Sequence, residues 1–87
     1  MYSPPRVKAE IKISVPQNVG NVIISSLRPE LATPTSDRSE VSIDPTTSGI
    51  LIKIEAEDIT ALRAAVNSYL YWVRAIIEIS DKIAEKK

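Results

Sequence analysis

A long amphipathic helix, predicted over residues 59–84, constrains the fold more than any other feature. Its apolar residues recur every three or four positions, which is the spacing of a helix that buries one side. Two adjacent apolar rows are present: Ile59, Leu62, Val66, Tyr69, Val73, Ile76 and Ile83 form one, and Ala61, Ala65, Trp72, Ala75 and Ile79 form the other. At 1.5 Å per residue such a helix is about 40 Å long, comparable to the width of a small domain. We therefore expect part of its apolar surface to be covered by a partner.

The segment before it begins with a strand and a short helix. Residues 6–15 alternate between polar and apolar side chains, which predicts a strand with one exposed face. Pro16 ends this strand and can serve as the first residue of a helix predicted over 16–28. The helix is expected to stop before Pro29, since proline lacks the amide that a helix interior requires. Residues 30–37 then read as a loop.

Two further strands are predicted over 38–44 and 50–57, again from alternating side chains. The intervening residues 45–49 have the composition of a hairpin turn, in which Gly49 is free to take a positive φ. Asp58 is a suitable N-cap for the long helix that follows. Lysines near the end of that helix complement its dipole.

The predicted element order is strand, helix, strand, strand, helix, within a single α+β domain covering residues 1–87. A right-handed crossover through the first helix makes the first two strands parallel in direction. The hairpin then sends the third strand back, so that it fits antiparallel between them. The result is a three-stranded antiparallel sheet of order 1-3-2 with both helices on its apolar face. Two sheet edges stay open, and these, like the long helix, favour self-association.

Composition excludes several classes of function. The 87 residues include no Cys and no His, so we expect no disulfide, no metal site, no cofactor and no catalytic residue. Eleven basic and eleven acidic residues give a formal net charge of zero, unlike a typical nucleic-acid-binding domain. The chain has no apolar run long enough for a membrane span, and its first residues do not resemble a secretory signal. A cytoplasmic protein is expected.

Three segments carry a resemblance to a known family. They are Ser26-Leu27-Arg28-Pro29-Glu30, then Asp37-Arg38-Ser39-Glu40-Val41-Ser42, then the run from Ala61 to Leu70 followed by Trp72-Val73. In this order and spacing they resemble the small dimeric subunit of the KEOPS (EKC) complex, which is related to the CTAG/LAGE cancer-testis antigens. The resemblance spans about Lys8 to Ile79.

This resemblance implies a KH-like fold and a homodimer without catalytic residues of its own. It also implies a scaffold role for the threonylcarbamoyltransferase subunit, which modifies adenosine in tRNA, with tRNA bound within the assembled complex. Whether a further small subunit competes for the dimer surface or for the surface that binds the catalytic subunit stays open. Chain and family agree on a non-catalytic interaction protein. The chain has no G-x-x-G between two helices, however, which argues against RNA binding by a standard KH mechanism.

The candidate partner-binding residues lie on the long helix: Leu70, Tyr71, Trp72, Arg74 and Ile77. Tryptophan and tyrosine are enriched where a partner removes water from a surface. Leu62, Val66, Tyr69 and Val73 are assigned to the core. For Leu70, Trp72 and Ile77 the core and the interface remain equal alternatives.

The candidate tRNA contacts are Arg28, Arg38 and Arg63, because a guanidinium group presents a forked set of donors to phosphate. In a chain without net charge, however, salt bridges or plain solvation are the favoured explanation for each of these arginines. Two alternative functions therefore stay open besides the scaffold. One is an autonomous RNA-binding module, and the other is a transcription-associated dimerisation module.

Overall fold

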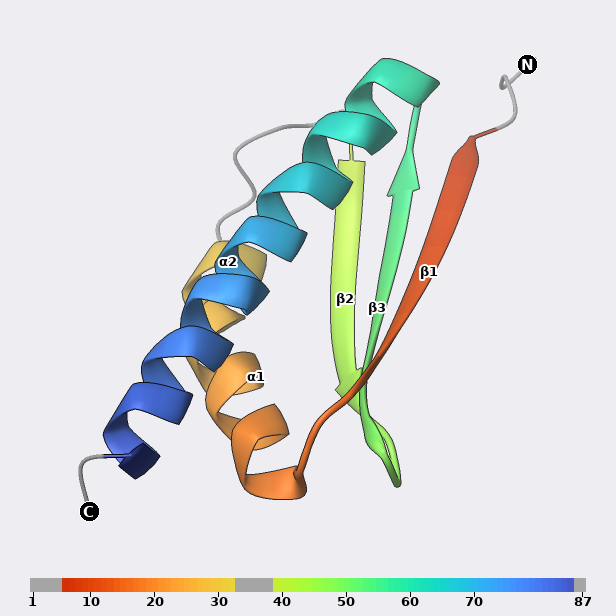
Figure 1. The fold of residues 1–87 in the computed structure, drawn as a ribbon. Coiled ribbons are helices and arrows are strands. Elements are labelled where there is room, and N and C mark those ends of the chain that lie inside the picture. Colours follow the sequence, from red (N-terminus) through yellow and green to blue (C-terminus); the bar gives the residue numbers. More distant parts are fainter. Residues whose placement is uncertain (1–5, 33–38, 86–87) are drawn as a thin grey trace.

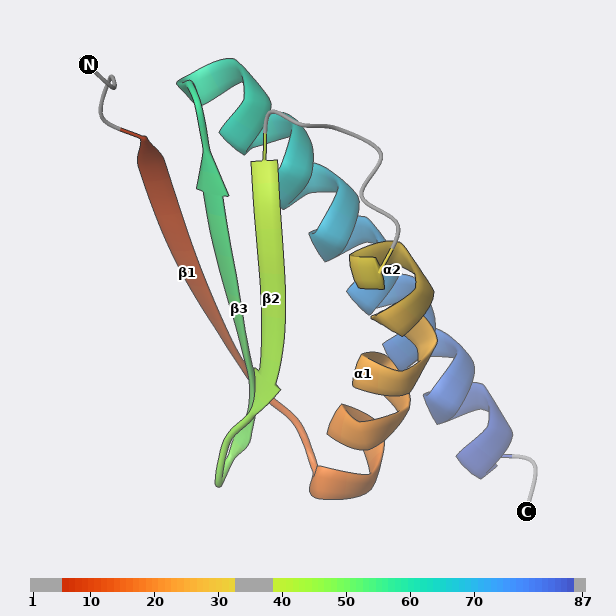
Figure 2. The ribbon, with the colours of Figure 1, turned by 180° about the vertical axis from the view of Figure 1, so that it is seen from behind.

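The structure is a computed structural model that describes residues 6–32 and 39–85. Its elements follow one another as β1 (Val7–Ser14), α1 (Gln17–Ala32), β2 (Ser39–Pro45), β3 (Gly49–Ala56) and α2 (Ile59–Glu85). The strands form one antiparallel sheet of order β1-β3-β2, and both helices lie on the same side of it (Figures 1 and 2). The predicted α+β class, element order and sheet topology are confirmed.

Register follows from side-chain alternation. Ile52 of the central strand lies opposite Ile11 on one side and Ile43 on the other, so the apolar residues of all three strands share a face. Lys53, its neighbour, lies opposite Glu10 and Ser42 on the other face. A shift of one residue would exchange the two faces, which is why this alternation fixes the register.

The core lies between the apolar face of the sheet and the two helices. Its largest fully buried side chains are Ile23, Ile50, Ile52 and Ile54, each at most 1% exposed. From α2, Tyr69 and Val73 are buried, and Leu62 and Val66 are half-buried against this cluster. The four helix residues that the sequence assigned to the core therefore all contact it.

The first helix is longer than predicted. It begins at Gln17, with the carbonyl of Pro16 accepting a hydrogen bond of 2.9 Å from the amide of Gly20. It also continues through Pro29 to Ala32, so the expected end at Arg28 is wrong. Leu31 packs against the core, and this apolar contact compensates for the backbone hydrogen bond that Pro29 cannot make. Of the loop predicted over 30–37, residues 33–37 lie outside the described residues.

The hairpin between β2 and β3 forms where it was predicted, but Gly49 has a different role. The amide of Thr46 donates to the carbonyl of Gly49 at 2.9 Å, which closes the turn. Among the described residues no glycine has a positive φ. Gly49 is instead required by close approach, because a Cβ there would overlap the carbonyl oxygen of Ile13 and lie 2.9 Å from the amide nitrogen of Val15.

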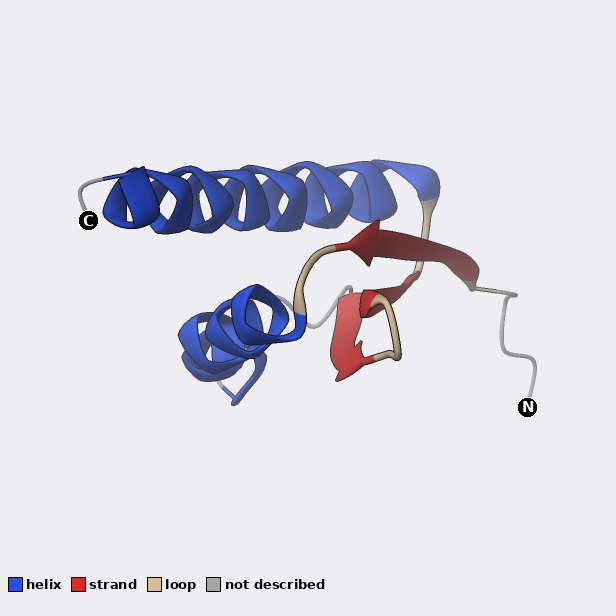
Figure 3. Cartoon of the chain, turned by 60° about the horizontal axis from the view of Figure 1, so that its bottom comes forward, coloured by secondary structure: helices blue, strands red, loops and turns tan. Residues whose placement is uncertain are grey.

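Helix α2 starts at the predicted cap and extends past the sheet. The amide of Ala61 donates to Asp58 Oδ1 at 2.8 Å, which is the expected N-cap hydrogen bond. Its 27 residues correspond to about 40 Å, whereas the 8 residues of a strand span about 26 Å. The C-terminal turns of α2 therefore project beyond the strands (Figures 1 and 3). None of the helices described has the length and hydropathy of a membrane span.

Candidate interaction surface

The exposed apolar side chains gather on α2. Among the described residues, the large apolar side chains that are most exposed are Val22, Ile59, Leu70, Tyr71, Ile79 and Ile83, and all but Val22 belong to this helix. No described element covers them. Apolar side chains that stay exposed in such number on a single element are characteristic of a surface that binds a partner.

Helical geometry divides these side chains between two flanks of α2. At 100° per residue Ile59, Leu70 and Ile77 lie within about 20° of one another, and we call them the Leu70 flank. Trp72, Ile79 and Ile83 lie within about 40° of one another and form the Ile79 flank, about 180° from Leu70. The buried residues Tyr69 and Val73 lie between the two flanks, so the core takes the middle of the apolar arc and leaves both sides accessible.

The Leu70 flank borders the core. Leu70 is 41% exposed, whereas Ile77 on the same flank is half-buried and packs against the core. Arg74 follows Leu70 by one turn, and its Nε donates to Glu78 Oε1 at 3.0 Å. Both charged side chains are mainly exposed, so this pair contributes at most about 0.5 kcal/mol and stays available to a partner.

The Ile79 flank lies on the part of α2 that projects beyond the sheet. Ile79 and Ile83 are 59% and 61% exposed, although they belong to the apolar rows that reach the core earlier in the helix. Trp72 is half-buried and packs against Tyr69, with the ring centroids 5.1 Å apart and the planes at 74°. This edge-to-face pair holds the indole at the margin between the core and the projecting turns.

The predicted partner-binding residues therefore do not form a single patch. Leu70, Arg74 and Ile77 share one side of α2, and Trp72 lies on the opposite flank. Tyr71, which is 71% exposed, lies on the outer side of the helix. Sequence reasoning did not select Ile79 or Ile83, although the difference in length between the helix and the strands indicates that the last turns lack a sheet to cover them.

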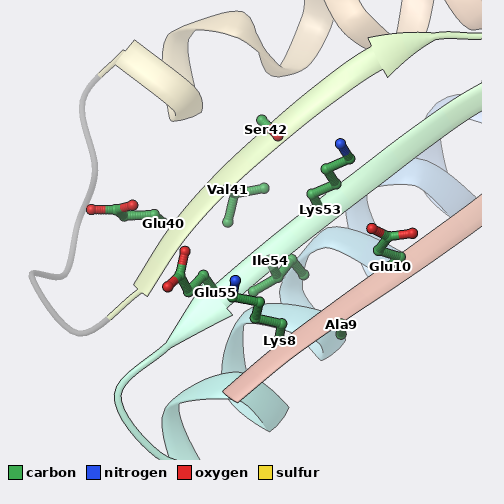
Figure 4. A pocket seen from close by; sticks show the side chains of 9 residues that line it. All are labelled: Lys8, Ala9, Glu10, Glu40, Val41, Ser42, Lys53, Ile54 and Glu55. Carbon is green, nitrogen blue, oxygen red and sulfur yellow. The ribbon is translucent and has the colours of Figure 1, made fainter. Parts of the chain in front are cut away.

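A polar hollow lies on the other face of the sheet. Side chains from all three strands line it, as Figure 4 shows. They are Lys8, Ala9, Glu10, Glu40, Val41, Ser42, Lys53, Ile54 and Glu55. Between β1 and β3 opposite charges face each other, since Glu10 pairs with Lys53 and Lys8 with Glu55 in the register, whereas between β3 and β2 Glu55 lies opposite Glu40. Within the described part of the chain, no group of three or more His, Cys, Asp or Glu residues is placed to hold a metal ion.

The two candidate tRNA contacts within the described residues lie on different helices. Arg28 is exposed on α1 and Arg63 is exposed near the start of α2. Arg38 lies outside the described residues. Immediately before β1, Arg6 Nε lies 3.5 Å from Glu55 Oε1, and the guanidinium donates to the Glu55 carbonyl at 3.4 Å. This basic side chain already has an acidic partner within the sheet.

Fold and surface together define a small α+β domain, β-α-β-β-α, whose exposed apolar side chains are concentrated on its C-terminal helix. The family described as Transcription factor Pcc1 matches residues 8–81. A curated relative from Pyrococcus abyssi (strain GE5 / Orsay), the KEOPS complex subunit Pcc1, is 32% identical over 77 residues. The match covers 87% of this chain and 94% of that relative. This chain belongs to the Pcc1 family.

Proposed function

We propose that this chain is the non-catalytic, homodimeric scaffold subunit of a KEOPS complex, which makes threonylcarbamoyladenosine in tRNA. The proposal rests on family membership together with one feature of the structure, the exposed apolar side chains of α2. The partner is the catalytic threonylcarbamoyltransferase subunit, in the cytoplasm. An apolar helical surface of this kind fits the apolar side of a partner helix.

The two flanks of α2 supply the apolar side chains that we expect the catalytic subunit to bury. Leu70 and Ile79 each add exposed apolar area, and their burial is worth roughly 25 cal/mol per Å². Tyr71 and Arg74 belong to the residue types that are enriched at binding hot spots. We propose that the partner helices pack along α2, and that Arg28, Arg38 and Arg63 contact tRNA within the assembled complex.

The test is light scattering on the purified chain, mixed with the catalytic subunit. Two variants separate the flanks: Leu70→Glu places a charge on one and Ile79→Glu on the other. Ile77→Glu is less suitable because Ile77 packs against the core and the substitution would endanger the fold. Ser42→Glu is the control, since it adds the same charge at an exposed polar position of β2, on the face of the sheet away from the helices.

We expect the wild-type chain and Ser42→Glu to bind the catalytic subunit. We also expect at least one of the two flank variants to lose binding while its circular dichroism stays that of a folded protein. A wild-type chain that does not bind the catalytic subunit contradicts the proposal. Binding that survives both flank substitutions places the contact somewhere other than the flanks of α2.

A further inference from the structure

The outer edge of β2 is open. Within the described residues β2 pairs with β3 alone, so the side of β2 away from β3 presents unpaired backbone groups. Both helices lie on the apolar face of the sheet, and neither supplies a strand to this edge (Figures 1 and 2). An unpaired edge is a template onto which an extended segment can add. The side chains that border the edge decide which segment it accepts.

Hydrogen bonding shows which residues of β2 direct their backbone outward. The amide of Thr46 donates to the carbonyl of Gly49 on the β3 side at 2.9 Å. Successive residues of an antiparallel ladder alternate between the two sides of a strand. The even-numbered residues of β2 therefore bond to β3, whereas Val41 and Ile43 direct their amides and carbonyls outward. Pro45, the last residue of the strand, has no amide, so the row of free amides stops at Ile43.

The polar face beside this edge is acidic. Glu40 and Asp44 stand on it with Ser42 between them, and all three are exposed. In the register Glu40 lies opposite Glu55 and Asp44 lies opposite Leu51, so neither has a basic residue across the ladder. The Glu40 side chain points away from β3 (Figure 4). Two carboxylates that form no ion pair among the described residues therefore border the open edge.

The opposite face beside the edge is apolar, and α1 contributes to it. Ile23 and Leu27 are buried in the core, whereas Ile24 and Leu31 are half-buried against it. At 100° per residue Ile24 and Leu31 lie about 20° apart. Glu30, whose charge reaches a buried tyrosine of α2, lies on the other side of the Ile23 and Leu27 line. Because α1 packs against both α2 and β2, Ile24 and Leu31 lie on the β2 side.

We propose that the β2 edge binds an extended segment of a partner protein in which basic and apolar residues alternate. The segment adds antiparallel to β2. Its residues opposite Val41 and Ile43 are apolar and cover the β2 side of α1, and its residues opposite Glu40 and Asp44 are lysine or arginine. The pattern is basic, apolar, polar, apolar, basic. This surface is additional to those of the proposed function and does not depend on it.

Each part of such a segment satisfies a group that the edge leaves open. Its backbone exchanges two hydrogen bonds with Val41 and two with Ile43, as directly opposed residues of a hydrogen-bonded antiparallel pair do. Its basic side chains neutralise the two carboxylates, because opposite charges stabilise directly opposed positions. Its apolar side chains remove water from Ile24 and Leu31, which the core leaves half-buried.

A second copy of this chain and a nucleic acid both fit the edge poorly. Antiparallel pairing of two β2 edges about Ser42 would place Glu40 of each copy opposite Asp44 of the other. Residues 8–12 of β1 have a suitable pattern, but the amide of Val15 bonds on the β3 side, so the apolar residues of β1 already direct their backbone inward. A nucleic acid is excluded because its phosphates would meet the two carboxylates.

Fluorescence anisotropy of the full chain with a labelled peptide tests the proposal. The probe is Thr-Lys-Val-Thr-Val-Lys-Thr, blocked at both ends, which has the proposed pattern at its centre. We expect it to bind saturably. Two altered peptides should bind at least about tenfold more weakly. One has serine in place of both valines and leaves the β2 side of α1 uncovered. The other has both valine amides methylated and cannot complete the ladder.

A charge exchange tests the role of the two carboxylates. The double variant Glu40→Lys with Asp44→Lys should bind the basic peptide at least about tenfold more weakly than wild type does. It should bind instead the acidic peptide Thr-Glu-Val-Thr-Val-Glu-Thr. Glu78→Lys with Asp81→Lys is the matched control, because it changes the net charge equally at exposed positions of α2. We expect this control to bind the basic peptide as wild type does.

Amide hydrogen exchange locates the bound peptide. The amides of Val41 and Ile43 should become protected, whereas those of Glu10 and Lys12, at the outer edge of β1, should not change. The proposal is overturned by protection elsewhere than β2, by an equal loss of binding in the control, or by the absence of saturable binding. These outcomes leave the proposed function untouched, because the probe involves neither the catalytic subunit nor the dimer.

Discussion

Gly49 illustrates how a single residue can be required by its surroundings rather than by its own backbone conformation. It begins β3 opposite Ser14, where the two strands leave no room for a side chain. The atoms that a Cβ would meet belong to the backbone of Ile13 and Val15, and such atoms cannot rotate away. Gly20 is different, because the atom nearest to a Cβ at that position would be a methyl carbon of Ile50, at 3.3 Å.

We predict that Gly49→Ala destabilises the protein by about 2–3 kcal/mol, the upper range for overpacking. Gly20→Ala should stay within about 1 kcal/mol of wild type, because the gain in helix propensity of about 1 kcal/mol offsets the crowding against Ile50. Urea unfolding followed by circular dichroism measures both. Equal effects of the two substitutions would contradict the steric explanation.

Tyr69 on α2 is buried, and its hydroxyl group is subject to the charge of Glu30 on α1. Burial of the side chain raises the pKa of Tyr69 above 10.0, and the negative charge of Glu30 on α1 adds to the increase. The folded state therefore holds the phenolic proton more tightly than the unfolded chain does. The corresponding stability is fully present below about pH 10 and is lost as the pH rises through the folded pKa.

We predict that wild type loses more stability than Tyr69→Phe between pH 9 and pH 11, since the variant has no proton to release at this position. Urea unfolding at several pH values measures the difference. Tyr71→Phe is the control, because it removes the same group from a side chain that is 71% exposed. Parallel pH profiles for wild type and Tyr69→Phe would contradict the role assigned to the buried phenol.

At the scale of elements, the decisive relation is between α2 and the sheet. The helix is longer than the strands it covers, so its two apolar rows are buried or half-buried from Ala61 to Ile76 and exposed at Ile79 and Ile83. Ile52 at the centre of β3 is 0% exposed, whereas Ile83 near the end of α2 is 61% exposed. Two isoleucines that look alike in the sequence therefore contribute very differently to the stability of the chain.

We predict that Ile83→Ala changes the free energy of unfolding by less than about 0.5 kcal/mol, as expected for a surface position. Ile52→Ala should cost about 3 kcal/mol, because it leaves a cavity in the core. Both are measured by urea unfolding at the same protein concentration. A cost for Ile83→Ala close to that for Ile52→Ala would show that the last turns of α2 are covered in the isolated chain.

At the scale of the whole molecule, the balance of charge bears on whether the isolated chain binds nucleic acids. The chain extends over 58 × 24 × 20 Å, and its eleven basic residues are matched by eleven acidic ones. Arg6 and Arg74, two of the basic side chains, already have acidic partners. Such a molecule lacks the excess positive charge that drives nonspecific binding to nucleic acids.

We predict that the isolated chain binds tRNA with a dissociation constant weaker than about 10⁻⁴ M at physiological salt, the weak end of nonspecific binding. Under the proposed function, the assembled complex should bind tRNA more tightly than the isolated chain does. Electrophoretic mobility shifts at varied salt measure both. Tight, steeply salt-dependent binding by the isolated chain would favour the autonomous RNA-binding alternative over the scaffold.

The sequence by itself determined the elements and their faces. Side-chain alternation in the strands, the N-cap at Asp58 and the turn before Gly49 are local features, and short-range hydrogen bonding and sterics decide them. They were enough to predict the β-α-β-β-α order and the 1-3-2 sheet. Pro29 was misjudged, because its local cost is outweighed by the burial of Leu31, which depends on residues distant in the sequence.

Only the tertiary structure decided which apolar side chains of α2 remain available. Ile77 and Ile79 have the same chemistry and lie two positions apart, but Ile77 packs against the core and Ile79 is exposed. The difference arises because burial depends on where the sheet ends and where α1 meets α2. Those positions are set by the packing of the whole chain, and helical periodicity alone cannot predict them.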